Sequence, residues 1–539
     1  MPIRMTDDDD DGQEEEKKKG DDSSGSGGWI FAILALVGGL IFRYPKVMIP
    51  ILLLGGLSFI CLADFDDNTN DSDDVEVEES YNDEDEGVER KSSSSGRLGA
   101  KFDDKKYRAT PVYEQLASSY NELPAKSSML KYAPKRKNQG DQGSCTGWAI
   151  SYAARTILQA KMTGENPDKI AFSPAYLFNQ NTDSECDGAY PIDLLTTLKK
   201  EGSLPFSDFP YNEESCRKKP SSSERSRAGE FRIEGFQRLT EDGEKYDTDL
   251  ESVKQYLANG SPVVISMEVG GSFMGLEEAV WHPSKQDYSE IKKYKKGKEV
   301  GDWGGHAMTA IGYDDDKDGG AIQIMNSWGE EFGSKGVFWL RYEDFNTFVR
   351  EAYSVYPPVQ SSRKDVRKLK FGLIENKSEE YIQLSKEDNF TYRTTDPIKK
   401  GTRFKVSVEN DSPTYVYIFG KETDGSSYVL FPYNDNHSPY CGTSGVRVFP
   451  RKQSLEADNV GKRDSIAVVF SSENLDYKKL NSQINSSSGK TYGDKIKKAL
   501  SSRLSTSAKL GSGGDFIELT SKEKDASKVD ALIIEFDKE

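Results

Sequence analysis

The chain has 539 residues, which is enough for two well-packed domains at roughly 100 to 200 residues per domain. Its 90 Asp and Glu residues outnumber its 72 Lys and Arg residues, and the net charge of −18 excludes a protein that binds nucleic acid through a general surplus of positive charge. Five cysteines in a chain of this length exclude a disulfide-stapled mini-protein, and three histidines leave few options for a histidine-rich metal site.

The negative charge is concentrated in two segments near the N-terminus. Residues 1–28 hold ten acidic and four basic side chains, and residues 64–97 hold fourteen acidic and three basic ones. Such segments, mixed with Ser and Gly, cannot bury enough apolar surface to offset the entropy of ordering. We therefore predict a disordered acidic tail over residues 1–28 and a disordered acidic linker over residues 64–121.

Residues 29–63, between these segments, carry the only membrane signal in the sequence. They consist of two uncharged apolar runs, 29–42 and 47–63, and each is near the lower limit for crossing a membrane, which takes roughly 20 helical residues. The doubled run and the long acidic lead disfavour a signal peptide. We predict a membrane anchor, either a hairpin or a single span preceded by an interfacial segment.

The basic residues around the anchor indicate its orientation. If Arg43 and Lys46 lie on the cytoplasmic side, everything after residue 63 lies outside the cytoplasm, in the periplasm or at the cell surface. Lys17, Lys18 and Lys19 favour the opposite orientation. We expect a location outside the cytoplasm.

A candidate nucleophile follows in the first folded domain. The sequence Gly143-Ser144-Cys145 precedes a helical run over residues 151–162, in which apolar residues recur at helical spacing. Cys145 is therefore expected at or just before a helix N-terminus. The free N–H groups there favour a thiolate and lower the pKa of a cysteine, which makes it a nucleophile.

A candidate base and its partner lie further along the chain. Residues 302–313 and 321–329 have the apolar pattern of strands, and the Asp- and Gly-rich segment 314–320 between them is a strong turn signal. A hairpin of these strands brings His306 and Asn326 side by side. The amide can then fix the imidazole tautomer and leave the other ring nitrogen for the sulfur.

The order of Cys145, Gly-His-Ala at His306 and Asn-Ser-Trp-Gly at Asn326 resembles the papain-like (C1) family of cysteine peptidases, over residues 122–357. The resemblance implies an α+β fold with two lobes, one helical and one resembling a β-barrel. It also implies that Cys145 attacks the scissile carbonyl, that His306 is the general base and then the acid, and that Asn326 orients the imidazole. By the same resemblance, Gln139 donates to the oxyanion and Trp328 covers the His306–Asn326 contact.

Two further segments match the family more distantly. Cys186 to Pro191 resembles the Cys-x-Gly-Gly segment that lines the substrate cleft, which makes Gly188 and Ala189 candidate cleft residues, together with Gly305. Residues 209–216 resemble the Tyr-Pro-Tyr stretch that follows it. The usual disulfide partners of Cys186 and Cys216 are missing, so these two either pair with each other or remain buried free thiols.

The chain departs from the family in two ways. The papain signature has two cysteines around the nucleophile, whereas this chain has only Cys145, followed by Thr-Gly. Aligning Cys145 with the first, structural cysteine would leave no nucleophile, but the ungapped alignment keeps Gln139 six residues upstream and is preferred. The inhibitory pro-helix of the family is also not recognisable in residues 64–120, so either activation needs no propeptide or the acidic linker has another role.

We expect no metal and no cofactor. The segment from Asp314 to Gly319 resembles the start of a calcium loop, but Met325 occupies position 12, where such a loop needs a bidentate Glu. His437 and Cys441 have a possible ligand spacing, yet two ligands do not make a site. A plain hairpin turn and a surface loop are the better interpretations.

A connector over residues 358–371 leads to a second domain over residues 372–539. Its period-2 pattern predicts a mainly antiparallel β domain, with one clear helix over residues 493–504. The predicted strands are Phe404–Glu409, Tyr415–Phe419, Tyr428–Phe431, Ser465–Phe470, Phe516–Leu519 and Ala531–Phe536. The segments beginning at Tyr415 and Tyr428 resemble a bacterial domain of unknown function that is appended to peptidases and kinases, which implies a bacterial origin.

The sequence thus predicts a membrane-tethered cysteine endopeptidase that hydrolyses peptide or protein substrates through a thioester acyl-enzyme, with a β-rich accessory domain of unknown partner. One alternative is an inactive papain-fold binding or scaffold protein. Another is a thiol-dependent acyl transferase.

Overall fold

The computed structural model describes residues 3–7, 97–239, 248–357, 366–522 and 524–539. The predicted acidic tail, the predicted anchor at 29–63 and the linker up to residue 96 lie outside this part of the chain, apart from the short strand β1 (Ile3–Asp7). No helix in the described ranges combines the length and the apolar character that a membrane crossing requires.

Residues 97–121, predicted to be the end of a disordered linker, are ordered, so that prediction is wrong for this stretch. Helix α3 (Asp104–Ala109) begins at the N-cap Asp103, whose carboxylate accepts from the Lys106 amide at 2.9 Å. Tyr107 on this helix is completely buried, and strand β2 (Val112–Tyr113) follows. A few buried apolar side chains therefore hold this segment against the domain, although its overall composition is strongly charged.

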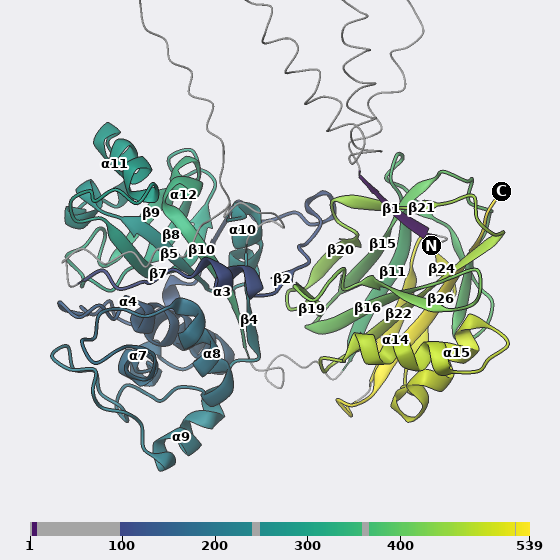
Figure 1. Ribbon diagram of the computed structural model, residues 1–539, viewed down its shortest axis with the longest axis horizontal. Helices are drawn as coiled ribbons and strands as arrows, with labels where there is room; N and C mark the ends of the chain where they lie inside the picture. The colour runs from purple at the N-terminus through teal and green to yellow at the C-terminus, as the bar shows by residue number, and fades with distance from the viewer. Residues whose placement is uncertain (1–2, 8–96, 240–247, 358–365, 523) are drawn as a thin grey trace, which may run out of the picture. The chain divides into compact units, whose positions relative to one another are not determined.

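The first lobe of the following domain is helical (Figure 1). Its central helix starts at Cys145 as α4 (Cys145–Gly147), continues as a π-helical stretch, η5 (Trp148–Arg155), and ends as α5 (Thr156–Thr163), where Gly164 adopts a φ of 72°. Around it pack α6 (Pro167–Ile170), α7 (Pro174–Asn181) and α8 (Pro191–Glu201), and α9 (Ser222–Ala228) belongs to the same lobe. The core of this lobe includes the sulfur-bearing Cys145 itself.

The second lobe is built on an antiparallel sheet. Its strands include β4 (Gly235–Arg238), β5 (Val263–Val269), β7 (Gly304–Asp314), β8 (Ala321–Met325), β9 (Val337–Arg341) and β10 (Val349–Tyr356), in the order β4-β10-β5-β7-β8-β9. Short strands β3 (Lys126–Ser128) and β6 (Val280–Trp281) extend it, and β2 pairs with both β4 and β18 (His437–Ser438). Helices α10 (Leu250–Ala258), α11 (Lys285–Lys295) and α12 (Tyr342–Phe348) cover the sheet. The predicted two-lobed α+β fold is confirmed.

The C-terminal domain consists of two sheets packed face to face. The first has the order β1-β21-β15-β11-β25-β23, and β12 and β20 pair with its inner strands. Its strands are β11 (Arg367–Glu375), β12 (Tyr381–Ile382), β15 (Arg403–Asn410), β20 (Gly445–Phe449), β21 (Gln453–Ala457), β23 (Lys509–Leu510) and β25 (Ile517–Ser521).

The second sheet has the order β17-β16-β22-β26-β14-β13-β24. Its strands are β13 (Leu384–Lys386), β14 (Thr391–Thr394), β16 (Thr414–Lys421), β17 (Ser427–Phe431), β19 (Tyr440–Cys441), β22 (Arg463–Ser471), β24 (Gly513–Gly514) and β26 (Val529–Asp537). Val468 and Ile534 point into the core between the sheets, whereas their neighbours Val469 and Ile533 face the other side. These strands read as unbroken apolar runs because both of their faces are buried.

Two helices, α14 (Tyr477–Ser486) and α15 (Tyr492–Leu500), pack against the second sheet (Figure 1). The predicted helix corresponds to α15, but α14 is not predicted from the sequence. All six predicted strands are present, and the domain begins at β11, within the stretch that the sequence assigns to the connector.

Candidate active site

Cys145 begins the central helix and is fully buried. Its Sγ accepts a hydrogen bond from the Ala307 amide at 3.4 Å, which puts the sulfur beside the residue next to His306. Burial raises the pKa of the Cys145 thiol to about 11, although the amides of Ala307, Gly99 and Thr146 lower it in part. The predicted lowering of this pKa at a helix N-terminus is therefore wrong for the site in this state, because desolvation outweighs the helix N–H groups.

His306 and Asn326 lie on neighbouring strands of the predicted hairpin. Strands β7 and β8 pair with Thr309 opposite Met325, and His306 Nε2 lies 2.7 Å from Asn326 Oδ1. Among the described residues the other ring nitrogen, Nδ1, has no hydrogen-bond partner. The prediction that the hairpin brings these two side chains together is confirmed.

Trp328 covers this pair. The centres of its ring and of the His306 ring are 4.4 Å apart, with an angle of 32° between the ring planes. Burial lowers the pKa of His306 to about 4, and the hydrogen bond to Asn326 opposes this effect in part. Burial therefore favours the uncharged form of both the thiol and the imidazole in this state.

Gln139 is held by three hydrogen bonds close to the nucleophile. Its Nε2 donates to the carbonyl of Gln142 at 2.8 Å and to the carbonyl of Arg97 at 3.0 Å, and its Oε1 accepts from the Ser327 hydroxyl at 2.7 Å. Both N–H groups of this amide are thus already bound to carbonyls of the chain itself, and the more distant acceptor is the Arg97 carbonyl. Ser327 is a residue that the sequence reasoning did not single out, although it belongs to the Asn-Ser-Trp-Gly motif.

That carbonyl belongs to a segment, residues 97–102, which we call the strap. The Ala100 amide donates to the Gly305 carbonyl at 3.0 Å, the Lys101 amide to the Ala189 carbonyl at 3.1 Å, and the Ala189 amide to the Gly99 carbonyl at 2.9 Å. The strap therefore runs between the two lobes, parallel to the backbone at Ala189. Its contacts explain why Cys145, Gln139 and His306 have no exposed surface.

The three predicted cleft residues all contact the strap. A Cβ atom at Gly305 would lie 2.0 Å from the Ala100 carbonyl oxygen, and one at Gly188 would lie 2.5 Å from the Gly99 carbonyl oxygen. Only residues without a side chain allow backbones to approach this closely. Gly188 and Gly305 thus let the strap lie directly against their backbone, and Ala189 bonds to it through its amide and its carbonyl. We call the space between these residues, which the strap fills, the slot.

The residues beyond the strap anchor it. Tyr107 packs edge-on against Tyr353 at a ring-centre distance of 5.2 Å, and Asp104 pairs with Arg350 at 2.8 Å. Lys106 pairs with Asp193 on the helical lobe at 2.9 Å. The strap is consequently attached to both lobes.

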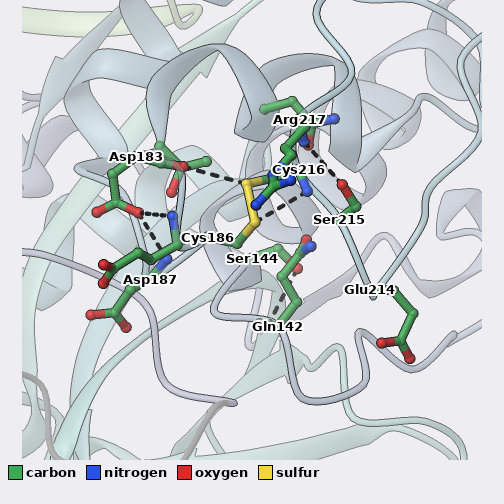
Figure 2. The surroundings of a disulfide bond; sticks show 12 residues. Gln142, Ser144, Asp183, Cys186, Asp187, Glu214, Ser215, Cys216 and Arg217 are labelled. Atoms are coloured by element: carbon green, nitrogen blue, oxygen red, sulfur yellow. Dashed lines mark hydrogen bonds between the residues drawn. A yellow bond between two sulfur atoms is a disulfide. The ribbon is translucent and has the colours of Figure 1, made fainter.

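Cys186 and Cys216 form a disulfide, which decides between the two possibilities that the sequence left open. The bond joins the segment before Gly188 to the end of the loop over residues 209–216 (Figure 2). The other described cysteines, Cys145 and Cys441, are free and buried. Within the described ranges, no group of three or more His, Cys, Asp or Glu side chains could hold a metal ion.

Comparison with known proteins agrees with this geometry. Residues 126–357 match the model of the papain family cysteine protease, and residues 398–474 match a domain of unknown function (DUF4384). Cathepsin B-like CP3 of Giardia intestinalis is 27% identical over 207 residues, and Cathepsin K of Mus musculus is 26% identical over 214 residues. These matches cover 38% and 39% of this chain, and 63% and 56% of the two relatives.

The solved structure of xylellain, a cysteine protease from Xylella fastidiosa, is 24% identical to this chain, covers 50% of it with 98% of its own length, and superposes with a TM-score of 0.40. The chain spans less than two thirds of the length of the two curated relatives named above. The motif order, the paired His306 and Asn326 and the family match lead to one conclusion. Residues 126–357 form a cysteine peptidase domain of the papain family, which is followed by a domain of unknown function.

Proposed function

We propose that this protein is an endopeptidase that hydrolyses peptide bonds through a thioester on Cys145. The observation that carries the proposal is the convergence of a buried thiol, the His306–Asn326 pair and the Gln139 amide at the end of one slot that already binds an extended peptide segment. This arrangement supplies a nucleophile, a base, a residue that orients the base and an oxyanion donor.

The chemistry follows from these positions. As His306 takes the thiol proton, the Cys145 sulfur bonds to the scissile carbonyl carbon, and the C–N bond then breaks as the imidazolium protonates the leaving amine. Water, deprotonated by the same imidazole, attacks the thioester and releases a carboxylic acid and the free thiol. The oxyanion of both tetrahedral intermediates would accept from Gln139 Nε2 and the Cys145 amide, and removing one such donor costs about 3 kcal/mol of barrier.

The described state is latent, because the strap occupies the slot. A substrate must break the strap's hydrogen bonds to Ala189 and Gly305 before it can reach Cys145. We infer that the chain hydrolyses peptides only to the extent that the strap is displaced or cut.

The first experiment compares the full chain with a Cys145→Ala variant, each incubated with a mixed peptide library and with a thiol-directed epoxide probe. A peptidase cleaves the library and is labelled at Cys145, and the variant does neither. Intact peptides together with binding that survives Cys145→Ala would instead support the scaffold alternative. Conjugates with an added amine would reveal acyl transfer, because an amine then competes with water for the thioester.

We further propose that the chain is tethered to a membrane through residues 29–63, and that both ends of this segment lie on the same side. The pairing of β1 (Ile3–Asp7) with β21 (Gln453–Ala457) supports this arrangement, since a single span would separate the two strands. A hairpin is the topology that satisfies the pairing, and Arg43 and Lys46 then lie at its cytoplasmic turn.

The disulfide supports a location outside the cytoplasm, where such bonds persist. The test uses intact cells and single cysteines introduced at Thr6 and at Glu165, which is exposed. A membrane-impermeant maleimide should label both cysteines. Labelling of one alone would exclude the hairpin, and labelling of neither would exclude the proposed location.

A further inference from the structure

The loop that carries the oxyanion donors rests on a second loop, residues 209–216. Gln139 and Cys145 lie at the two ends of the first loop, and the Tyr211 side chain of the second loop reaches both ends. The Tyr211 hydroxyl donates to the Gln139 carbonyl at 2.7 Å and also lies 2.7 Å from the Ser144 hydroxyl oxygen.

The direction of these hydrogen bonds is determined by chemistry. A carbonyl only accepts, so the single phenolic proton goes to Gln139, and the Ser144 hydroxyl is then the donor to the phenolic oxygen, which is much nearer than its other acceptor, the Gln142 carbonyl at 3.5 Å. One tyrosine oxygen thereby links the backbone of the residue that supplies the amide donor to the residue directly before the nucleophile. Burial raises the pKa of Tyr211 to about 12, so the phenol keeps this proton at physiological pH.

The ring of Tyr211 is itself fixed. It packs edge-on against Trp148 of the central helix, with ring centres 5.0 Å apart and planes at 75°. Trp148 stands three residues after Cys145, so the same side chain contacts both the loop and the helix on either side of the nucleophile.

Other contacts hold the two loops together. Gln142 Nε2 donates to the carbonyls of Asn212 and Glu213 at 3.3 and 3.2 Å. The far end of the second loop is attached to the cleft wall through the Cys186–Cys216 disulfide, and Figure 2 shows Gln142 and Ser144 close to this bond. The second loop therefore connects the oxyanion loop with the wall that contains Gly188.

We propose that Tyr211 is a positioning residue for the oxyanion hole, which aligns the Gln139 amide and the Cys145 backbone N–H through its two hydrogen bonds. The proposal rests on the peptidase function proposed above. A donor stabilises an oxyanion only when it is held within a fraction of an ångström of the correct place. Without the phenolic oxygen, the Gln139 carbonyl and the Ser144 hydroxyl lose this partner, and the loop is then held to the second loop by the longer hydrogen bonds of Gln142, which do not fix its two ends.

The test replaces Tyr211 by Phe in the full-length chain, both in the wild-type background and with Gly99→Val, which displaces the strap. We expect kcat for a peptide to fall by about 10- to 100-fold, less than the 10²- to 10³-fold typical when a donor is removed outright, with KM changed by less than about twofold. The inhibition constant of a peptide aldehyde should rise in parallel, because its adduct with Cys145 carries the same oxyanion.

Alkylation of Cys145 by iodoacetamide distinguishes positioning from general damage. This reaction displaces iodide at a saturated carbon and forms no oxyanion, so its rate should change by less than about twofold. The matched control is Tyr152→Phe, because Tyr152 also packs on Trp148, at 4.8 Å, and also donates to a carbonyl at 2.7 Å, but to that of Lys135, outside the oxyanion loop. It should leave kcat and the aldehyde constant unchanged.

A double variant completes the test. If Tyr211 acts through Gln139, adding Tyr211→Phe to Gln139→Ala should reduce kcat much less than it does alone. Fully multiplicative losses, an unchanged aldehyde constant, or an alkylation rate that falls as far as kcat would each overturn the proposal. If the parent protein hydrolyses nothing, the proposed peptidase function fails. The inhibition constants of the peptide aldehyde for Tyr211→Phe, Tyr152→Phe, Gln139→Ala and the double variant still test the role of Tyr211.

Discussion

Gly99→Val is the perturbation that tests the latent state most directly. A Cβ atom at position 99 would lie 1.9 Å from the carbonyl oxygen of Gly143 and 2.4 and 2.7 Å from its C and Cα atoms. All three are backbone atoms of the loop before Cys145, so no side chain can move aside. The strap of this variant cannot remain seated in the slot.

The size of the effect follows from the hydrogen bonds that are lost. Three backbone hydrogen bonds join the strap to Ala189 and Gly305, and each contributes about 1 kcal/mol net. Losing these three, without counting the hydrogen bond from Gln139 to the Arg97 carbonyl, destabilises the seated state by about 3 kcal/mol, which raises the open fraction on the order of 100-fold when that fraction is small. Helix α3 should stay docked, because Tyr107 and the Lys106–Asp193 pair are not touched.

The assay is the rate at which iodoacetamide alkylates Cys145, measured by mass spectrometry on the full chain, together with peptide hydrolysis. Both should rise on the order of 100-fold in Gly99→Val, and the labelling profile should move to lower pH. The reason is that burial holds the pKa of Cys145 at about 11 while the strap is seated, so the reactive thiolate forms mainly at alkaline pH.

Gly275→Val is the matched control, because Gly275 is exposed and a Cβ atom there meets nothing within 4 Å. It should leave both rates unchanged. If Gly99→Val folds normally and yet labels and cleaves at the wild-type rate, the strap does not control access to the thiol, and the reasoning is refuted.

Four further predictions follow from other contacts. Burial raises the pKa of Glu351 to about 8, from a value near 4.5 in the unfolded chain. The stability that this carboxyl contributes is therefore fully present below pH 4.5 and is lost as the pH rises through 8. Urea titrations at several pH values should show this decline in the wild type and not in Glu351→Gln. Asn326→Ala removes the group that orients His306 and should lower kcat by about 10- to 100-fold with little change in KM, as steady-state kinetics can check. Reducing the Cys186–Cys216 bond opens a loop with a sequence separation of 30 and should lower the free energy of unfolding by about 3 kcal/mol; an unchanged midpoint in denaturant would contradict this. Hydrogen peroxide should oxidise Cys145 far more slowly in the wild type than after displacement of the strap, which peptide mapping would measure.

The sequence predicts the contact between His306 and Asn326 because the signals for it are local. The Asp- and Gly-rich turn over residues 314–320 sets the hairpin, and the hairpin sets the contact between His306 and Asn326. The six strands of the C-terminal domain are predictable for the same reason, since short alternating or apolar stretches between turn signals are local features, although β22 and β26 are unbroken apolar runs with both faces buried.

The strap is not predictable because its signal is three-dimensional. Gly99 and Ala100 are small residues in a charged segment, and only the slot between the lobes gives them a role. The N-cap at Asp103 is a local sign of helix α3 that the composition of the segment obscured. Helix α14 escapes prediction because only Leu480 and Ile484 on it are buried, too few to show a helical period.

The strap also explains how an oxidised cysteine pair, Cys186 and Cys216, and a free thiol, Cys145, can exist in the same domain. A compartment that keeps Cys186 and Cys216 oxidised would also oxidise an exposed low-pKa thiol, since oxidation proceeds through the thiolate. In the seated state Cys145 has no exposed surface and burial raises its pKa, so it is neither accessible nor ionised. The disulfide includes Cys186, two residues before Gly188, whereas Cys145 is free and buried. Latency and protection of the thiol are therefore consequences of one contact, and displacing the strap removes both together.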